Sequence, residues 1–349
     1  MADDTELHRL LTAARSPYTP AEVDALLAGV AAAHRQRGAP ESWLALVADH
    51  PGDALTATLR ERLARHTGNS DAGPADRLAA LRAELTRRGL DGLAVPRADE
   101  HQGEFVPPHA QRLAWLTGFT GSAGAAVILR ETAALFVDGR YTAQARREVD
   151  TERIAVHDSA TTSAASWLAT ALDGGTLGLD PWLHTENART RLHRAAGRAG
   201  GSLVSLDANP IDAVWPDRPP RPISAIEPHP LTLTGETGAA KRARIGRAVA
   251  DAGADAAVLT LPDSIAWLLN IRASDIEHTP VALSFALVDA DGGVAWFVDD
   301  RKLTTAARAA LDAEVAVHPP GGLPAALDAR AAAGERLLAD PASAPAAVV

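Results

Sequence analysis

The side chains that could act in catalysis are scattered along the chain and are not grouped in a recognisable motif. The twelve histidines include no HExxH sequence and no close histidine–carboxylate pair with the spacing of zinc ligands. The 349 residues contain no cysteine and no GxSxG sequence, so the possible nucleophiles reduce to serines with no indicated base. The sequence therefore indicates neither a metal centre nor covalent catalysis within this chain.

A glycine-rich stretch, Gly118–Gly124 (GFTGSAG), has a superficial likeness to a phosphate-binding loop. It lacks the lysine of a P-loop, and a strand pattern follows it, whereas a dinucleotide-binding loop stands between a strand and a helix. We interpret the stretch as a turn at which the backbone passes close to another part of the protein.

The composition is that of an acidic globular protein. A net charge of −10 without long runs of like charge gives no reason to expect nucleic acid or a membrane as a partner. No stretch approaches the ~20 apolar residues that span a bilayer, and Met1–Leu11 lacks a basic region followed by an apolar one. We therefore expect a cytoplasmic protein, which the absence of cysteine also suits.

The chain begins with helical patterns and then changes to alternating helices and strands. Residues 1–66 predict a helical N-terminal extension, in which Thr19–Glu22 (TPAE) has the form of a capping box. Residues 67–76 are small and polar and predict a linker. The alternation that follows predicts an α/β fold.

A second linker, residues 213–232, is rich in proline and divides the α/β part into a first domain at 77–212 and a second at 233–349. Strands of the first domain are predicted from short apolar runs bounded by turn residues. These runs are 91–96, 123–129, 132–138, 153–156, 175–180 and 201–206.

The second α/β domain repeats the first, which predicts one fold that occurs twice. Four blocks recur in the same order: 77–95 with 242–259, 113–124 with 265–276, 134–149 with 295–311, and 175–181 with 335–341. The alignment places Trp115 opposite Trp267, and this recurrence favours a core position for Trp115. It also places Asp138 opposite Asp299, and we interpret both aspartates as helix N-caps.

The two copies differ after the last block. In the first copy a predicted helix (184–201) and strand (202–206) follow, whereas only nine residues follow Asp340 in the second copy. We expect the second domain to lack a helix and a strand of its core, and we expect the sequence to be truncated at this point.

The run from Pro96 to Ala145 resembles the first domain of three-domain Xaa-Pro aminopeptidases (aminopeptidase P), which belong to the creatinase-like, or pita-bread, superfamily. The blocks 178–185 (GLDPWLHT) and 263–288 resemble matching parts of the first and second domains of that family. The resemblance covers residue 77 to the end, and residues 1–66 are an extension.

The resemblance implies two related α/β domains of the creatinase N-terminal type, ribonuclease-H-like and with mixed sheets, followed by a pita-bread domain. In the family that last domain holds two divalent metals, usually manganese, whose bridging hydroxide attacks the bond before proline. None of its ligand motifs occurs here, so we expect the pita-bread domain to be absent, this chain to bind no metal and the chain alone to be inactive. The implied partners are peptides with proline at the second position and, through the missing domain, a second subunit in a homodimer.

The resemblance also indicates substrate-access candidates, His101, Glu104, Phe119 and Arg140. Glu104 corresponds to a position that faces the active site in the family, where it would hold the peptide amine or a water molecule; the alternative is a solvated loop carboxylate. His101 either assists Glu104 or is a surface or turn-stabilising histidine.

Phe119 forms an apolar wall at a domain mouth or packs in the core. Arg140 clamps a carboxylate or, as its counterpart Arg301 suggests, belongs to a helix start. Asp180 and His184 are interpreted as turn and cap residues.

Three functions from different classes remain open at this stage. The chain is the N-terminal regulatory and substrate-access half of a metal-dependent Xaa-Pro aminopeptidase, or a stand-alone peptide-binding module that does not hydrolyse peptides, or a module for assembly. The unfinished second copy favours the first of these.

Overall fold

The computed structural model describes residues 2–23, 26–27, 47–48, 52–66 and 73–349. The chain divides into two compact units, Met1–Gly73 and Pro74–Val349. Most of the predicted linker, residues 67–72, lies outside the described residues. The second unit begins directly with a helix that has Pro74 at its first position, where a missing N–H costs nothing.

The N-terminal unit is helical in its described part, as predicted. Helices α1 (Ala2–Ala13) and α4 (Asp53–His66) pack around a small apolar core that includes the fully buried Leu7 and Leu59. The predicted capping box is present, because Thr19 N donates to Glu22 Oε2 (2.8 Å) and Glu22 N donates to Thr19 Oγ1 (3.4 Å).

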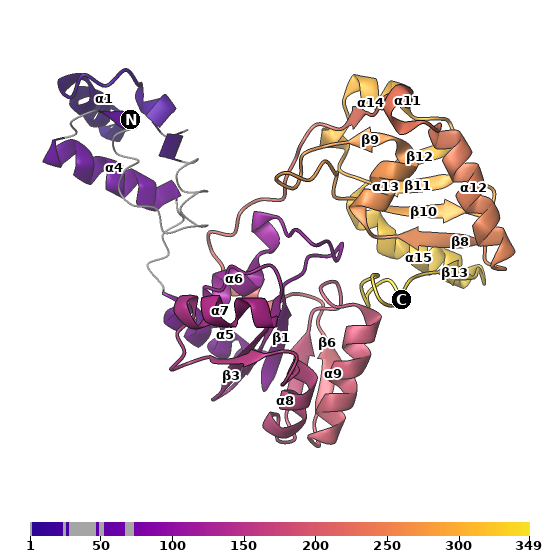
Figure 1. The fold of residues 1–349 in the computed structure, drawn as a ribbon, viewed down its shortest axis with the longest axis horizontal. Coiled ribbons are helices and arrows are strands. Elements are labelled where there is room, and N and C mark those ends of the chain that lie inside the picture. Colours follow the sequence, from indigo (N-terminus) through magenta and orange to yellow (C-terminus); the bar gives the residue numbers. More distant parts are fainter. Residues whose placement is uncertain (1, 24–25, 28–46, 49–51, 67–72) are drawn as a thin grey trace. The chain divides into compact units, whose positions relative to one another are not determined.

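The first α/β domain is a mixed sheet with helices on both faces (Figure 1). Its helices are α5 (Pro74–Arg87), α6 (Arg112–Thr117), α7 (Thr142–Glu148), α8 (Ala164–Ala171), α9 (Glu186–Arg198) and α10 (Pro210–Val214). Its strands are β1 (Gly92–Pro96), β2 (Gly124–Leu129), β3 (Ala133–Val137), β4 (Ala155–Asp158), β5 (Thr176–Leu179) and β6 (Ser202–Ser205). The strand order is β4-β3-β2-β1-β5-β6, with β2 antiparallel to both of its neighbours and the other pairs parallel.

Alternation along the central strands separates two apolar layers in this domain. Leu93 and Val95 of β1 point into the layer that contains the leucines of α5, whereas Ala94 points into the layer that contains Leu168 and Leu192 of α8 and α9. Successive residues of a strand face opposite sides of a sheet, and both sides are covered here. The strand therefore has to be apolar throughout, which is why the run at 91–96 predicted a buried strand.

The second α/β domain repeats the order and directions of five of the six strands of the first, and no described strand matches β6 (Figure 1). Its helices are α11 (Leu231–Thr234), α12 (Gly238–Asp251), α13 (Pro262–Leu269), α14 (Thr305–Ala310) and α15 (Leu323–Ala332). Its main strands are β8 (Ala256–Leu259), β10 (Phe285–Asp289), β11 (Val294–Phe297), β12 (Val315–His318) and β13 (Leu337–Leu338), in the order β12-β11-β10-β8-β13. A small separate sheet pairs β7 (Glu227–Pro228) with β9 (Ile271–Arg272). The duplication predicted from the sequence is confirmed.

Equivalent residues occupy equivalent positions in the two copies. Asp138 and Asp299 each cap a 3₁₀ turn by accepting from the backbone N–H two residues later, so the N-cap interpretation is confirmed. Trp115 and Trp267 lie on the helices that follow the first strand of each copy. The core position that the repeat favoured for Trp115 is confirmed, since Trp115 is 9% exposed, whereas its counterpart Trp267 is 40% exposed.

Among the described helices, none combines the length and the apolar character that a membrane span requires.

Candidate functional site

The two α/β domains meet through matching chain segments that follow β5 and β13. Asn187 N donates to the Pro341 carbonyl (3.0 Å), and Ala347 N donates to the Pro181 carbonyl (3.1 Å). The alignment of 175–181 with 335–341 makes these two hydrogen bonds each other's counterparts. An antiparallel bridge between Thr185 and Pro345 lies between them.

An aromatic cluster extends the contact between the domains. Trp182 of the first domain lies against Phe285 of the second, with ring centroids 5.9 Å apart, and packs on the apolar cluster formed by Phe285, Phe297 and Leu323. The His101 ring stacks on Phe285 with centroids 4.4 Å apart, and its Nδ1 lies 3.3 Å from the Thr260 carbonyl oxygen. These side chains fix the loop after β1 against the second domain.

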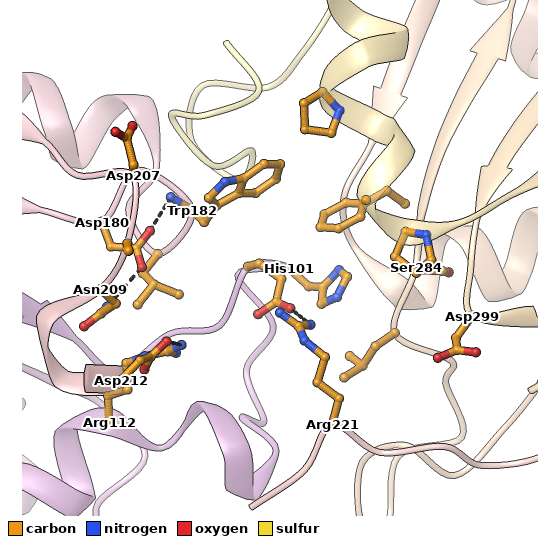
Figure 2. A pocket seen from close by; sticks show the side chains of 18 of the residues that line it. His101, Arg112, Asp180, Trp182, Asp207, Asn209, Asp212, Arg221, Ser284 and Asp299 are labelled. Carbon is orange, nitrogen blue, oxygen red and sulfur yellow. Dashed lines mark hydrogen bonds and ion pairs between the residues drawn. The ribbon is translucent and has the colours of Figure 1, made fainter. Parts of the chain in front are cut away.

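A cavity of about 770 Å³ lies beside this contact and is lined by both domains and by the linker (Figure 2). One wall is apolar and aromatic, with Trp182 and Phe285. The other walls are polar and carry acidic side chains together with basic side chains that form ion pairs. These polar side chains are Arg88, Glu100, Arg112, Asp180, Asp207, Asn209, Asp212, Arg221, Ser284, Asp299 and Lys302.

Most bases around the cavity already have an acidic partner. Arg112 forms a two-pronged ion pair with Asp212, through bonds of 2.7 and 2.9 Å, and Arg221 pairs with Glu100. Asp180 accepts from Trp182 N and from Asn209 Nδ2, both at 3.0 Å. Figure 2 shows Asp180, Asp207 and Asn209 along one side of the cavity, opposite Ser284 and Asp299. The lining has the features of a small-molecule or peptide site, with apolar area and a few placed polar groups.

Asp99 and Glu100, two neighbouring residues in the loop after β1, have pKa values that are shifted in opposite directions. Burial raises the pKa of Asp99, whose Oδ1 accepts from the backbone N–H of His101 (3.0 Å) and of Gly103 (3.4 Å). Burial alone would also raise the pKa of Glu100, but the charges of His101 and Arg221 outweigh it, and the pKa falls to about 2. Glu100 is therefore charged at neutral pH and holds the linker arginine.

His109, in the 3₁₀ turn Pro108–Ala110, is almost completely buried, and neither ring nitrogen has a hydrogen-bond partner among the described residues. Burial lowers its pKa to about 4; Glu100 opposes this shift, and the charges of Arg221, Arg218 and Arg112 reinforce it. The folded protein therefore favours the neutral ring.

Replacing His109 with phenylalanine is expected to flatten the pH dependence of stability between pH 6.5 and about 4. Between pH 6.5 and about 4, the His109 ring is protonated in the unfolded chain but neutral in the folded protein. Because the unfolded chain binds the extra proton, the free energy of unfolding falls as the pH falls through this range. One such group contributes at most about 1.4 kcal/mol per pH unit. Urea unfolding between pH 4 and 7.5 measures this slope. His193→Phe, at an exposed position of α9, should keep the parent slope. An unchanged slope in His109→Phe would contradict the account.

The structure places the four candidates from the sequence in different surroundings. His101 reaches the contact between the domains, whereas the Glu104 side chain is exposed on the same loop. Phe119 is buried in the core of the first domain, where its ring meets Tyr141 edge-on at 6.0 Å between centroids. Arg140 is exposed and pairs with Asp138 at 2.9 Å. The structure does not bring these four side chains together.

Of the residues that line the cavity, sequence reasoning proposed His101 as a site residue, but it missed Glu100, Trp182, Arg221 and Lys302. One signal was available, because Asp99, Glu100 and His101 are three consecutive titratable residues that begin three positions after a predicted buried strand ends at Pro96. All three are buried in the structure.

The residues present do not fit a pair of divalent metal ions. In the part of the chain that the structure describes, no group of three or more His, Cys, Asp or Glu side chains is placed to hold a metal. Asp99, Glu100 and His101 are adjacent, but each is engaged separately, by backbone N–H groups, by Arg221 and by Phe285 respectively.

Comparison with known proteins finds the same two domains. A family model described as the creatinase/prolidase N-terminal domain matches residues 77–214, and a second model with the same description matches residues 217–349. The chain is 35% identical over 267 residues to Aminopeptidase P2 of Arabidopsis thaliana, covering 75% of this chain and 38% of that protein. It is also 35% identical over 247 residues to the probable Xaa-Pro aminopeptidase P of Coccidioides posadasii (strain C735), covering 70% of this chain and 38% of that protein.

Among solved structures, the X-prolyl aminopeptidase of Caenorhabditis elegans, described as a cytosolic enzyme with a di-nuclear active site, is similar with a TM-score of 0.74 and 29% identity. The similarity covers 79% of this chain and 48% of that enzyme. The chain spans about two fifths of the length of the two curated relatives.

Proposed function

The chain belongs to the family of creatinase/prolidase N-terminal domains, and on that premise we propose that it forms the N-terminal, substrate-access half of a metal-dependent Xaa-Pro aminopeptidase. That enzyme removes the N-terminal residue that precedes proline, acts in the cytoplasm and is a homodimer. Its two divalent ions, manganese in this proposal, are bound by a catalytic domain of the longer protein and not by these residues.

One observation carries the proposal. A single similarity, with a TM-score of 0.74, extends over most of this chain and therefore over the two α/β domains as a pair. A fold alone does not define a function, but a pair of domains in one arrangement is a more specific likeness than either domain separately.

Within this proposal the four candidate residues have different roles. Glu104 is the exposed carboxylate that meets the peptide amine or a site water, and Arg140 is an exposed base able to meet a carboxylate. His101 fixes the loop that carries Glu104 against the second domain. Phe119 packs against the glycine-rich stretch Gly118–Gly124, because its ring fills the space beside Gly121 and Gly124.

We expect the purified 349-residue chain to hydrolyse no Xaa-Pro peptide, with or without added manganese, since it offers no described cluster that could bind and activate water. Release of the N-terminal amino acid from an Xaa-Pro-Xaa peptide, followed by mass spectrometry, tests this. A complete Xaa-Pro aminopeptidase assayed in parallel shows that the conditions support the reaction. Manganese-dependent release by the pure chain would contradict the assignment of the chemistry to another domain.

The cavity between the domains supports a second candidate, a peptide-binding module that does not hydrolyse peptides. Its volume of about 770 Å³ is within the range of small-ligand sites, and all of its walls come from this chain. Two measurements separate the candidates. Calorimetric titration of the chain with an Xaa-Pro-Xaa peptide reports binding, and sequencing of the gene downstream of the Val349 codon reports whether metal-ligand motifs follow. Peptide binding by a chain whose gene encodes no metal-ligand motifs downstream favours the peptide-binding module. Metal-ligand motifs downstream, together with no peptide binding by this chain, favour the substrate-access half of an aminopeptidase.

A further inference from the structure

The cavity between the two α/β domains lies at an edge of the first sheet where three parallel strands end. Strands β1, β5 and β6 are neighbours and run in the same direction, so their carboxyl ends share one edge. His101 comes after β1, Asp180 after β5 and Asp207 after β6, and all three line the cavity. In open α/β sheets, ligands bind in the crevice outside the carboxyl ends of the strands. The topology therefore favours a ligand in this cavity.

The second domain contributes the corresponding edge of its own sheet. Strands β8 and β11 are both antiparallel to β10, which lies between them, so the ends of β8 and β11 share an edge with the start of β10. Phe285 begins β10 and Asp299 comes soon after β11, and both line the cavity. The cavity is thus lined by the same edge of two related sheets.

The cavity carries negative charge that no base compensates. Each base in its lining already pairs with an acid. These pairs are Arg88 with Glu84, Arg112 with Asp212, Arg221 with Glu100, and Lys302 with Asp275. In contrast, Asp180 accepts only from the neutral groups Trp182 N and Asn209 Nδ2, and Asp207 has no partner among the described residues. Each carboxylate oxygen can accept two hydrogen bonds, so both aspartates can still bind a cation.

The arginines of the lining do not offer an equivalent site for an anion. Arg112 keeps one nitrogen, Nη1, without a partner, but this atom is buried and out of reach of a ligand. Arg221 lies against Glu100, whose negative charge opposes a bound anion. The charge of the cavity therefore selects for a cation.

The His101 ring adds a hydrogen-bond acceptor to this lining. His101 is 2% exposed, and its Nδ1 lies 3.3 Å from the Thr260 carbonyl oxygen. A carbonyl oxygen only accepts, so Nδ1 carries the proton and Nε2 of the neutral ring keeps a lone pair. No described group donates to Nε2, and the ring lines the cavity. A buried acceptor without a partner is costly, which favours a ligand that donates a hydrogen bond there.

Trp182 and Phe285 supply the apolar part of the lining, with ring centroids 5.9 Å apart. Aromatic side chains pack against the apolar body of a ligand and also attract a cation. Figure 2 shows Trp182 beside Asp180, on the side of the cavity that carries Asp207. The acidic and aromatic parts of the lining are therefore neighbours.

We propose that this cavity binds a primary amine with an apolar body and a second N–H group. The ammonium, which has three donors and no acceptor, lies at Asp180 and Asp207. The apolar body lies against Trp182 and Phe285, and the second N–H donates to Nε2 of His101. This inference narrows the second candidate function, on which it rests, to ligands with a free amine, and it involves no hydrolysis.

The test titrates the chain with tryptamine in a calorimeter, because tryptamine combines an ammonium, an aromatic body and an indole N–H. Tryptophol is the neutral analogue and indole-3-propionate the anionic one. Tryptophol should bind about tenfold more weakly than tryptamine or worse, a difference of about 1.4 kcal/mol, and indole-3-propionate should not bind. The indole N–H resonance of Trp182, assigned from Trp182→Phe, should shift with tryptamine. That of Trp167, in the apolar layer of α8 and α9, should not.

Variants test each end of the ligand. Asp207→Asn should weaken tryptamine binding by about threefold, since this carboxylate is exposed, and the double variant with Asp180→Asn by about tenfold or more. Asp251→Asn, at an exposed position of α12 before β8, removes the same charge at the opposite edge of the sheet and should change nothing. His101→Phe should weaken tryptamine several-fold but leave 2-phenylethylamine, which lacks the second N–H, unchanged.

Equal affinity for the three indoles, no tryptamine binding at millimolar concentration, or binding that leaves the Trp182 resonance in place would overturn the amine site. Titration with an Xaa-Pro-Xaa peptide separates this result from the second candidate function. Tryptamine binding without peptide binding supports the amine site and removes the peptide-binding module. Peptide binding without tryptamine binding leaves the module standing and removes the amine site.

Discussion

Replacing Asp275 with alanine is expected to destabilise the second α/β domain by about 3–5 kcal/mol, the cost of leaving a buried charge without its partner. Asp275 pairs with Lys302 at 2.5 Å, and both side chains are almost completely buried. The carboxylate also accepts from the backbone N–H groups of Leu283 (2.7 Å) and Ser224 (3.1 Å). One residue thus joins the linker, the segment before β10 and a base that lines the cavity.

Hydrogen exchange of the β10 amides measures this loss, because it reports the opening of the second domain separately from the rest of the chain. Glu277→Ala is the matched control, since Glu277 is an exposed acid two residues away and its removal should change stability by no more than about 0.5 kcal/mol. Equal exchange rates in the two variants would mean that the buried pair contributes nothing to the domain.

Replacing Gly246 with alanine is expected to destabilise the second domain by about 1–3 kcal/mol, although alanine is the better helix former. A Cβ at this position of α12 would lie 2.7 Å from Gly292 N and 2.9 Å from the Ala290 carbonyl oxygen, and both of these atoms belong to the backbone of the turn between β10 and β11. The helix or the turn would have to move. The matching position in the first domain is Arg82, whose side chain reaches the Leu129 carbonyl (3.0 Å), so the close approach is particular to the second copy.

Gly197→Ala provides the opposite expectation within the same chain. Gly197 lies in helix α9, and a Cβ there would have no atom within 4 Å, so alanine should stabilise by about 0.4–1 kcal/mol through the unfolded state. Urea unfolding of both variants, with hydrogen exchange to locate the change, tests the pair. Stabilisation by both substitutions would show that α12 can shift away from the turn at little cost.

The sequence predicted the fold well because local patterns and the internal repeat agree. The runs at 123–129, 132–138 and 175–180 became β2, β3 and β5, since a strand covered on both faces must be apolar throughout. The repeated blocks then predicted the second sheet from the first. The repeat gave no information on burial where the copies differ, and the exposure of Trp267 follows from the absence of a covering helix among the described elements.

The cavity was far less predictable because its lining comes from separate segments that meet only when the two domains pack. Lys302, in a run of charged residues, has the pattern of a solvated surface residue, yet its charge is buried beside Asp275. Trp182 stands in a turn after β5 and becomes part of the interface only because Phe285, about a hundred residues later, lies beside it. No local pattern encodes such a pairing.

The paired hydrogen bonds of Asn187 with Pro341 and of Ala347 with Pro181 have the form of an isologous interface, in which one patch meets its own copy and every contact occurs twice. Two identical subunits that associate in this way must accept every substitution on both sides at once. Joining the copies in one chain removes that constraint, because each side then mutates independently. These two backbone bonds match, although Ala346 N also donates to the His184 carbonyl (2.7 Å) in a bond that has no counterpart among the described ones. The side chains differ more, with Trp182 and His184 at the positions that match Ala342 and Ala344. That divergence is what allows a tryptophan of one copy to occupy the apolar cluster of the other.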